Sequence, residues 1–309
     1  MNNPFRFIFQ KWKFIYEQKY KYLLILTFLI LFAAMVQIGV QTAVEGDFVH
    51  RGVSLKGGST LTFDYSSDLS ISEMEVSLQQ EFPQIDLTLR TISSAGTITA
   101  LAIDSGAQDS GQIEPILTFL QEKYNISKAQ ISVEVMGSAL GNSFFQQTFV
   151  ALGVAFLLMA LVVFFYFRIP IPSLAVILCA FSDIVITLAI FNLTGMKLST
   201  AGVAAFLMMV GYSVDTDILL NSRVLKHKEG TVLDRVYGAI KTGMTMTSTT
   251  LGAVFVGLLL VESEAIKQIM LIIFIGVLVD IVMTWVQNVG ILRWYLESKE
   301  KKKEEKISL

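Results

Sequence analysis

Hydrophobic and polar positions follow each other in long blocks along this chain. A bilayer's hydrocarbon core is crossed by about twenty consecutive apolar residues in a helix. Six runs reach that length, and they span about 22–44, 144–167, 171–192, 195–220, 238–261 and 266–295. The pattern therefore predicts a polytopic α-helical membrane protein with six transmembrane helices.

One long polar block separates the first run from the second, and it has periodicities of its own. Strands are expected over 53–65, 85–93, 97–104 and 131–136, and helices over 71–82 and 113–124. Apolar residues recur every three to four positions in both helical stretches, and Pro83 ends the first of them. The order βαββαβ predicts a ferredoxin-like α+β domain, with two helices on one face of an antiparallel sheet.

Basic residues set the expected orientation. They gather before the first run, at Arg168, between Arg223 and Arg235, and in the C-terminal tail. Because cytoplasmic segments are rich in Lys and Arg, both termini are predicted to be cytoplasmic and the ferredoxin-like domain extracytoplasmic. A cleaved signal peptide is the alternative for the N-terminus, but the first run and the arm before it are long for one.

This orientation divides the chain into five regions. Residues 1–21 are a basic cytoplasmic arm, 22–44 the first transmembrane helix, 45–140 the extracytoplasmic domain between the first and second helices, 141–296 a five-helix bundle and 297–309 a charged cytoplasmic tail. We expect the arm to lie at the membrane interface, because its basic residues alternate with aromatic ones.

Composition agrees with a membrane protein and limits the chemistry. Of the 309 residues 53% are hydrophobic, and the net charge is −2. Cys179 is the only cysteine, and His50 and His227 lie far apart. The sequence therefore predicts no disulfide framework, no metal site and no cofactor.

Isolated carboxylates interrupt three of the apolar runs. An ionised side chain at a helix centre in the membrane costs about 2.5–3.5 kcal/mol, so each carboxylate is a candidate functional group. Residues two apart on a helix lie about 200° apart around its axis, so Asp215 and Asp217 cannot face one groove. One is expected to be functional and the other to be an anchor; alternatively, both only solvate that end of the helix. The candidates are Asp183, Asp215, Asp217 and Asp280.

The fifth run carries small and polar residues at helical spacing, and Lys241 is its only cation. Small residues let helices approach closely, and hydroxyl groups bond across them, which explains the stripe by packing alone. A water-filled groove explains it equally well. The stripe comprises Gly238, Lys241, Thr242, Thr245, Ser248, Thr249 and Gly252.

Three glycines, Gly52, Gly57 and Gly58, precede the first expected strand. A phosphate-binding loop is disfavoured because no Lys-Ser/Thr pair follows, and a glycine-enabled bend is the simpler interpretation. Residues 52–58 resemble the motif that opens the first extracytoplasmic strand in the SecD/SecF family of protein-translocase subunits. Ser54 stands where that family usually has aspartate.

Two further motifs in the membrane region carry the same resemblance. Residues 182–188 resemble the third-span motif of the SecF branch, and Gly211, Tyr212 and Asp215 belong to a segment similar to its fourth-span motif. Bacterial SecF continues with Asn-Asp-Thr, whereas this chain has Asp215-Thr216-Asp217. The related SecD pattern aligns its aspartate with Asp215, so the resemblance favours Asp215 as the functional acid.

The fifth and sixth runs point to the archaeal form of this branch. Bacterial SecF has an arginine three residues before a Met-Thr-Ser sequence, but here Gly243 holds that position and Lys241 is the nearest cation. The segment from Asp280 to Trp294 resembles archaeal members of the family. The resemblance covers nearly the whole chain from Gly52 onward.

The resemblance implies a protein-export subunit and not an enzyme. It implies a multi-pass protein of the cell membrane that acts with SecD, the Sec channel and a translocating polypeptide, and with no nucleic acid. Coupling to an ion gradient would use the intramembrane aspartates, with Asp215 titrating in a groove shared with a partner. Half of a small-molecule or lipid exporter of the resistance-nodulation-division superfamily is the alternative. A membrane enzyme with aspartates as acid and base lacks a recognisable nucleophile or metal-ligand pattern.

Overall fold

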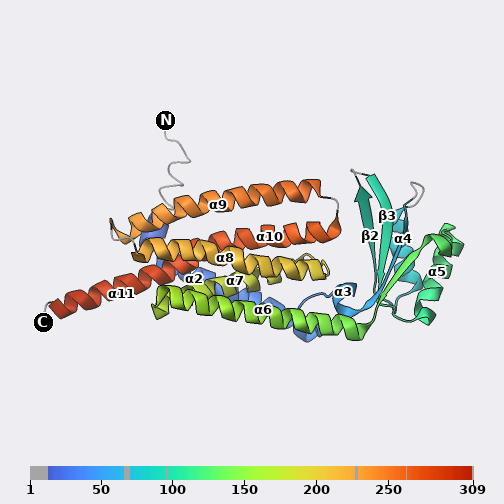
Figure 1. Cartoon of the computed structure of the whole chain (residues 1–309), viewed down its shortest axis with the longest axis horizontal. Helices are drawn as coiled ribbons and strands as arrows, with labels where there is room; N and C mark the ends of the chain where they lie inside the picture. Colours follow the sequence, from blue (N-terminus) through green and yellow to red (C-terminus); the bar gives the residue numbers. More distant parts are fainter. Residues whose placement is uncertain (1–12, 66–69, 95–96, 227–228, 262, 308–309) are drawn as a thin grey trace.

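The computed structural model describes residues 13–65, 70–94, 97–226, 229–261 and 263–307. The molecule is elongated, with a bundle of long helices and a small α+β domain at one end (Figure 1). In the described residues six helices are long and apolar enough to cross a membrane, which confirms the predicted number of spans. They are α2 (Tyr20–Glu45), α6 (Ser138–Phe167), α7 (Pro170–Leu193), α8 (Thr200–Lys226), α9 (Val232–Leu260) and a last helix made of α10 (Glu264–Val282), the π-helical η2 (Met283–Asn288) and α11 (Val289–Ile307).

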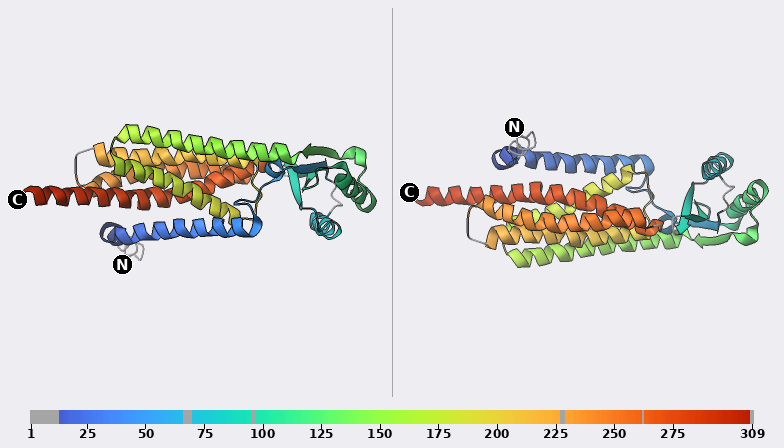
Figure 2. Two further views of the ribbon diagram at one scale, coloured as in Figure 1. Left: turned by 90° about the horizontal axis from the view of Figure 1, so that it is seen from below. Right: turned by 90° about the horizontal axis from the view of Figure 1, so that it is seen from above.

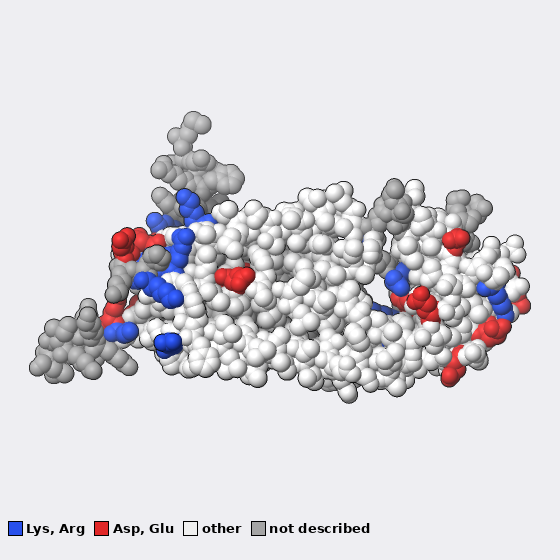
Figure 3. Space-filling view, viewed as in Figure 1, with Lys and Arg blue, Asp and Glu red and all other residues white. Residues whose placement is uncertain are grey.

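The helices divide into a buried centre and an exposed periphery. In their most apolar windows α7 and α8 are 56% buried, whereas α2 and α9 are 17% and α6 only 6% buried. Helix α7 contacts both α2 and α6, which lie on opposite sides of the bundle (Figure 2). Charged side chains gather at the two ends of the molecule and leave a mostly uncharged band between them (Figure 3). Exposed Leu, Ile and Phe side chains on α2 and α6 therefore suit contact with lipid.

The α+β domain has the predicted ferredoxin-like topology. Its antiparallel sheet has the strand order β2-β3-β1-β4, and α4 and α5 cover one face. Alternate side chains of β1 and β3, such as Leu61 and Ile103, are buried against Met74 and Leu120 of the two helices. The elements are β1 (Gly58–Asp64), α4 (Ile71–Glu81), β2 (Leu87–Ser94), β3 (Thr97–Ser105), α5 (Ser110–Tyr124), the 3-10 turn η1 (Lys128–Gln130) and β4 (Ser132–Met136).

The start of the first strand differs from the prediction. A strand was expected over 53–65, but Val53–Lys56 forms a short helix, α3, and β1 begins only at Gly58. Gly57 has a φ of 88°, and a Cβ there would lie 2.5 Å from the Cα of Ser138. The reason for the difference is therefore steric: the glycines let the chain turn tightly against the start of α6, which alternation of apolar residues does not encode.

The segment before β1 is joined to the loop between α7 and α8. The backbone N–H of Gly52 donates to the Leu198 carbonyl at 2.8 Å, and the N–H of Leu198 donates to the His50 carbonyl at 2.6 Å. The Ser54 hydroxyl accepts from the backbone N–H of Thr200 at 3.3 Å. Since Thr200 is the first residue of α8, Ser54 caps that helix from a distant part of the sequence.

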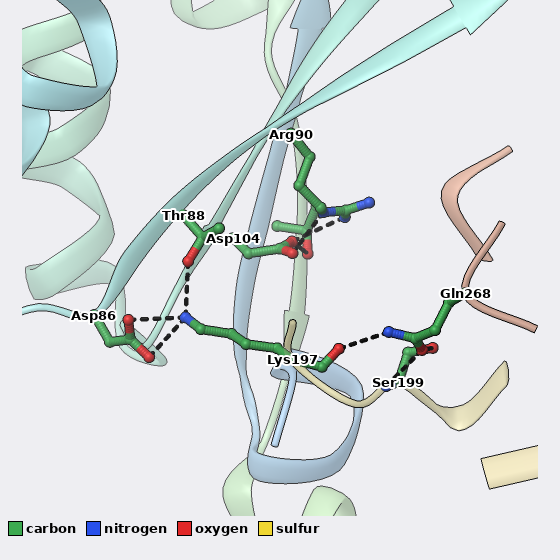
Figure 4. A network of polar contacts seen from close by, with 8 residues as sticks. Asp86, Thr88, Arg90, Asp104, Lys197, Ser199 and Gln268 are labelled. Carbon is green, nitrogen blue, oxygen red and sulfur yellow. Dashed lines mark hydrogen bonds and ion pairs between the residues drawn. The ribbon is translucent and has the colours of Figure 1, made fainter. Parts of the chain in front are cut away.

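A second connection is made by residues that line a cavity of about 840 Å³ between the sheet and the bundle. Figure 4 shows these polar contacts. Lys197 Nζ lies 2.8 Å from Asp86 Oδ1 and 2.8 Å from Thr88 Oγ1. Gln268 of α10 donates to the Lys197 carbonyl at 2.8 Å and so fixes the loop. The uncovered face of the sheet contributes Thr60, Thr88, Arg90, Asp104 and Glu134 to the cavity.

Candidate functional site

Three of the four candidate acids meet inside the helix bundle. Asp183 on α7, Asp217 on α8 and Asp280 on α10 are each 0% exposed. We call these three residues the acid cluster. Asp215 lies on the exposed face of α8, as the angular separation from Asp217 requires. The structure therefore separates the two neighbouring aspartates, and it places Asp217 with the other acids.

Asp217 is held by side chains of the last helix. Asn288 Nδ2 donates to Asp217 Oδ1 at 2.7 Å, and the Thr284 hydroxyl donates to the same oxygen at 3.0 Å. Asn221, one turn further along α8, donates to Asn288 Oδ1 at 3.2 Å. The carboxylate thus lies between α8 and the last helix and accepts from two neutral donors.

The other two acids are linked to Asp217 through hydroxyl groups. Thr284 Oγ1 also lies 2.9 Å from Asp280 Oδ1, so this hydroxyl bridges two carboxylates. Thr216 Oγ1 lies 3.1 Å from both oxygens of Asp280. Ser213 donates to Asp183 Oδ2 in a short hydrogen bond. A single connected network therefore joins α7, α8 and α10.

No basic side chain forms an ion pair with the acid cluster among the residues that the structure describes. Asp183 Oδ1 and Asp217 Oδ2 are buried and have no hydrogen-bond partner there. Three unpaired charges in a low-dielectric interior would cost several kcal/mol each. In that part of the chain, burial of the acid cluster is therefore offset by hydrogen bonds to neutral groups and not by ion pairs. In these same regions, no group of three acidic, His or Cys side chains is arranged to hold a metal ion.

The π-helical segment η2 supplies two of the donors. Asp280, Thr284 and Asn288 follow each other at intervals of four residues. In an ideal α-helix, each would be rotated around the axis relative to the one before, so the three would not lie on one line. A π turn holds more residues than an α turn, so it keeps residues with this spacing closer to one line. Segments of this kind occur often at functional sites. Here the segment directs Thr284 and Asn288 at the same oxygen of Asp217.

The polar stripe of α9 does not reach the acid cluster. Lys241, Thr245 and Thr249 are exposed and line an open hollow of about 520 Å³. Gly243, on another face, is buried against the last helix, and a Cβ there would lie 2.2 Å from Trp285 Cζ2. Close packing thus accounts for Gly243, which lies outside the stripe. Lys241, Thr245 and Thr249 form an outward-facing polar surface, whereas Gly238 and Thr242 are half-buried.

The motif glycines lie in two different places. Gly52, Gly57 and Gly58 belong to the joint between the domain and the bundle, where a Cβ at any of them would lie within 3.0 Å of backbone. Gly211 of α8 is exposed and faces open space. Tyr212 is half-buried, and its hydroxyl has no partner in the described part of the chain.

Sequence reasoning missed the neutral half of the network. Ser213, Thr216, Thr284 and Asn288 were not singled out, although each is fully or almost fully buried. A signal was present, because Thr284 and Asn288 follow Asp280 at intervals of four residues. Polar residues at helical spacing beside an intramembrane acid predict a shared face.

Comparison with known proteins shows which family this chain resembles. The family model described as "Protein export membrane protein SecD/SecF, C-terminal" matches residues 116–298. A protein-export membrane protein SecF from Pyrococcus furiosus is 34% identical over 293 residues, covering 95% of this chain and 97% of the relative. The chain belongs to the SecD/SecF family.

Other SecD/SecF relatives agree. SecF from Methanothermobacter thermautotrophicus is 37% identical over 254 residues, which cover 81% of this chain and 85% of the relative. The crystal structure of SecDF from Thermus thermophilus, a translocon-associated membrane protein, matches with a TM-score of 0.68 at 18% identity. That match covers 89% of this chain but 38% of the SecDF chain. The fold of this chain therefore matches one part of the longer SecDF chain.

Proposed function

We propose that this chain is a SecF-type subunit that works with a SecD-type partner to assist protein export, and that the acid cluster couples this work to proton movement. Relatives named SecF that match over nearly their whole length support the first part. The observation that carries the second part is the burial of three carboxyl groups from three helices, with no ion pair to a basic side chain among the described residues. A change in proton occupancy would alter the hydrogen bonds between α7, α8 and the last helix.

We propose further that the exposed polar surface beside the cluster receives the partner. Asp215 on α8 and Lys241, Thr245 and Thr249 on α9 are exposed within apolar helices. Helices α8 and α9 are in contact, so the partner would cover two neighbouring helices. Polar groups facing lipid are costly, and partner helices that bond to them would remove that cost. A translocating polypeptide and the Sec channel remain the expected further contacts of the assembled complex.

The test compares the buried Asp217 with the exposed Asp215, two positions away on the same helix. Asp217→Asn keeps the size of the side chain but fixes it as neutral, so the complex should assemble while export per assembled complex falls by at least about tenfold. Asp215→Asn should instead lower the amount of complex recovered with the partner and leave export per complex nearly unchanged. The matched measurement is export from membrane vesicles, divided by the amount of co-purified partner.

The opposite result is equally informative. The family resemblance favoured Asp215 as the titrating acid, and that hypothesis predicts that Asp215→Asn lowers export per complex. Undiminished export per complex in Asp217→Asn would exclude proton coupling through the cluster. Failure to recover any SecD-type protein with the wild-type chain would exclude the proposed partnership. If a partner is recovered, equal recovery with Asp215→Asn would exclude Asp215 from its contact surface.

A further inference from the structure

The N-terminal arm contacts three other helical segments, α9, η2 and α11. Within the arm, residues 13–18 are helical and lie just before α2. Arg293 of α11, only 6% exposed, donates through Nη1 to the Tyr16 carbonyl and through Nη2 to the Glu17 carbonyl, both at 2.9 Å. The last carbonyls of a helix have no partners within it, so Arg293 satisfies two groups that would otherwise be free.

Two tyrosines extend this connection. Tyr237 of α9 donates to Glu17 Oε1 at 2.9 Å, and Tyr20 donates to Glu297 Oε2 of α11 at 2.6 Å. The Arg293 guanidinium lies 4.1 Å from the centre of the Tyr20 ring. The arm is therefore fixed to α9 and α11 by specific bonds between residues more than 200 positions apart in sequence.

One contact of the arm reaches the π-helical segment. The Tyr16 hydroxyl donates to the backbone carbonyl of Trp285 at 2.8 Å, and Trp285 belongs to η2. A π turn interrupts the regular i→i+4 bonding of the helix, and here the N–H of Val289 is shared between the carbonyls of Thr284 and Val286. An outside donor thus satisfies a carbonyl within the interrupted stretch. Burial raises the pKa of the Tyr16 hydroxyl, so it remains a donor at all physiological pH values.

We propose that Tyr16 is a positioning residue for the acid cluster: by bonding Trp285 it holds η2 in the π-helical form that presents Thr284 and Asn288 to Asp217. Trp285 immediately follows Thr284, whose hydroxyl lies between Asp217 and Asp280. Without the bond, η2 relaxes toward α-helical pairing and turns Asn288 relative to Thr284. The significance for transport rests on the function proposed above, but the geometric claim is independent of it.

The chain carries a natural reporter of this geometry. Cys179, its only cysteine, is 0% exposed, and its Sγ lies 3.9 Å from Thr284 Oγ1. Reaction of this thiol with a membrane-permeant maleimide requires transient separation of α7 from η2, so the labelling rate reports how often that contact opens. The experiment uses the full chain in lipid nanodiscs.

Tyr16→Phe removes only the hydroxyl, and it should raise the labelling rate of Cys179 about three- to tenfold, the change expected from one hydrogen bond. Tyr237→Phe is the matched control, because it removes the bond to Glu17 but leaves Trp285 bonded, and its rate should equal that of wild type. An unchanged rate in Tyr16→Phe would overturn the proposal. An equal increase in both variants would also overturn it, because the arm as a whole would then be responsible.

A second readout separates positioning from general support. If Tyr16 positions the donors of Asp217, Tyr16→Phe shifts the pH dependence of export per complex, whereas a general loss of stability only lowers the amount of complex. An unshifted profile counts against the positioning role. The labelling rate does not depend on export, so an Asp217→Asn variant with normal export would refute the proposed function and leave the Tyr16 result standing.

Discussion

At the scale of single residues, Asp217 is buried in the acid cluster and Asp215, two positions before it, is exposed. The intramembrane acids were recognisable because charges are rare in apolar runs, and the helical repeat correctly separated Asp215 from Asp217. Which of the two lies inside depended on how α8 is rotated against its neighbours, and a single helix does not encode that. The resemblance favoured Asp215, whereas the structure buries Asp217.

Ser54 offers a test at this scale, because it caps α8 across the joint between domain and bundle. Ser54→Ala should lower the stability by about 0.5–2 kcal/mol through loss of the cap. Ser54→Asp, which introduces the residue usual in the family, should raise it by about 0.3–1 kcal/mol, because a negative charge is favourable at a helix N-terminus. The apparent melting temperature of the purified protein would show both effects.

The control for Ser54 is another serine before a helix. Ser70 precedes α4 but its side chain makes no capping bond, so Ser70→Ala should melt like wild type. Equal melting temperatures for Ser54→Ala and Ser70→Ala would show that the bond to Thr200 contributes nothing.

At the scale of elements, regular periodicity was predictable and its interruptions were not. The predicted helix over 71–82 corresponds to α4, because apolar residues at helical spacing report a buried face directly. The short helix α3 and the π-helical η2 were missed. Each depends on contacts with a distant segment: α3 on the start of α6, and η2 on α8, α9 and the arm.

The packing of α9 on η2 gives a prediction for these elements. Gly243→Ala would place a methyl group 2.2 Å from the Trp285 ring, so α9 must move, at a cost of about 1–3 kcal/mol. Gly252, on the same helix, has no atom within 4 Å of such a methyl group. Gly252→Ala should therefore be neutral or stabilise the helix by about 0.5–1 kcal/mol.

Unfolding of the two alanine variants in the same detergent would measure the difference. The midpoint should fall for Gly243→Ala and not for Gly252→Ala. Similar midpoints would mean that α9 and η2 pack less tightly than described.

In the whole molecule, the connections between the long helices lie at the two ends of the bundle (Figure 1). The α+β domain lies at one end, and the turn between α6 and α7, the loop between α8 and α9, and α11 lie toward the other (Figure 1). Six spans and a separate α+β domain followed from apolar length and strand periodicity. The contact between the domain and the bundle could not be predicted in this way. Lys197 and Asp86, which form part of it, are 111 residues apart in sequence, and neither stands out by composition.

This arrangement predicts one orientation in the membrane. Reporter fusions after Arg168, after Glu229 and at the C-terminus should all read cytoplasmic, because the basic residues gather at that end. A fusion within the α+β domain should read external. Paired alkaline phosphatase and fluorescent protein fusions make the comparison, and an external reading after Glu229 would contradict the six-span arrangement.

The pairing of β1 with β4 has a consequence for the history of the chain. Gly58, where the sheet begins, and Met136, where it ends, are partners in the register, so the two ends of the inserted segment lie about 5 Å apart. A segment whose two ends lie close together can be removed, exchanged or duplicated by genetic recombination without a change in the path of the membrane helices. The α+β domain and the bundle can thus diverge at different rates under different selection.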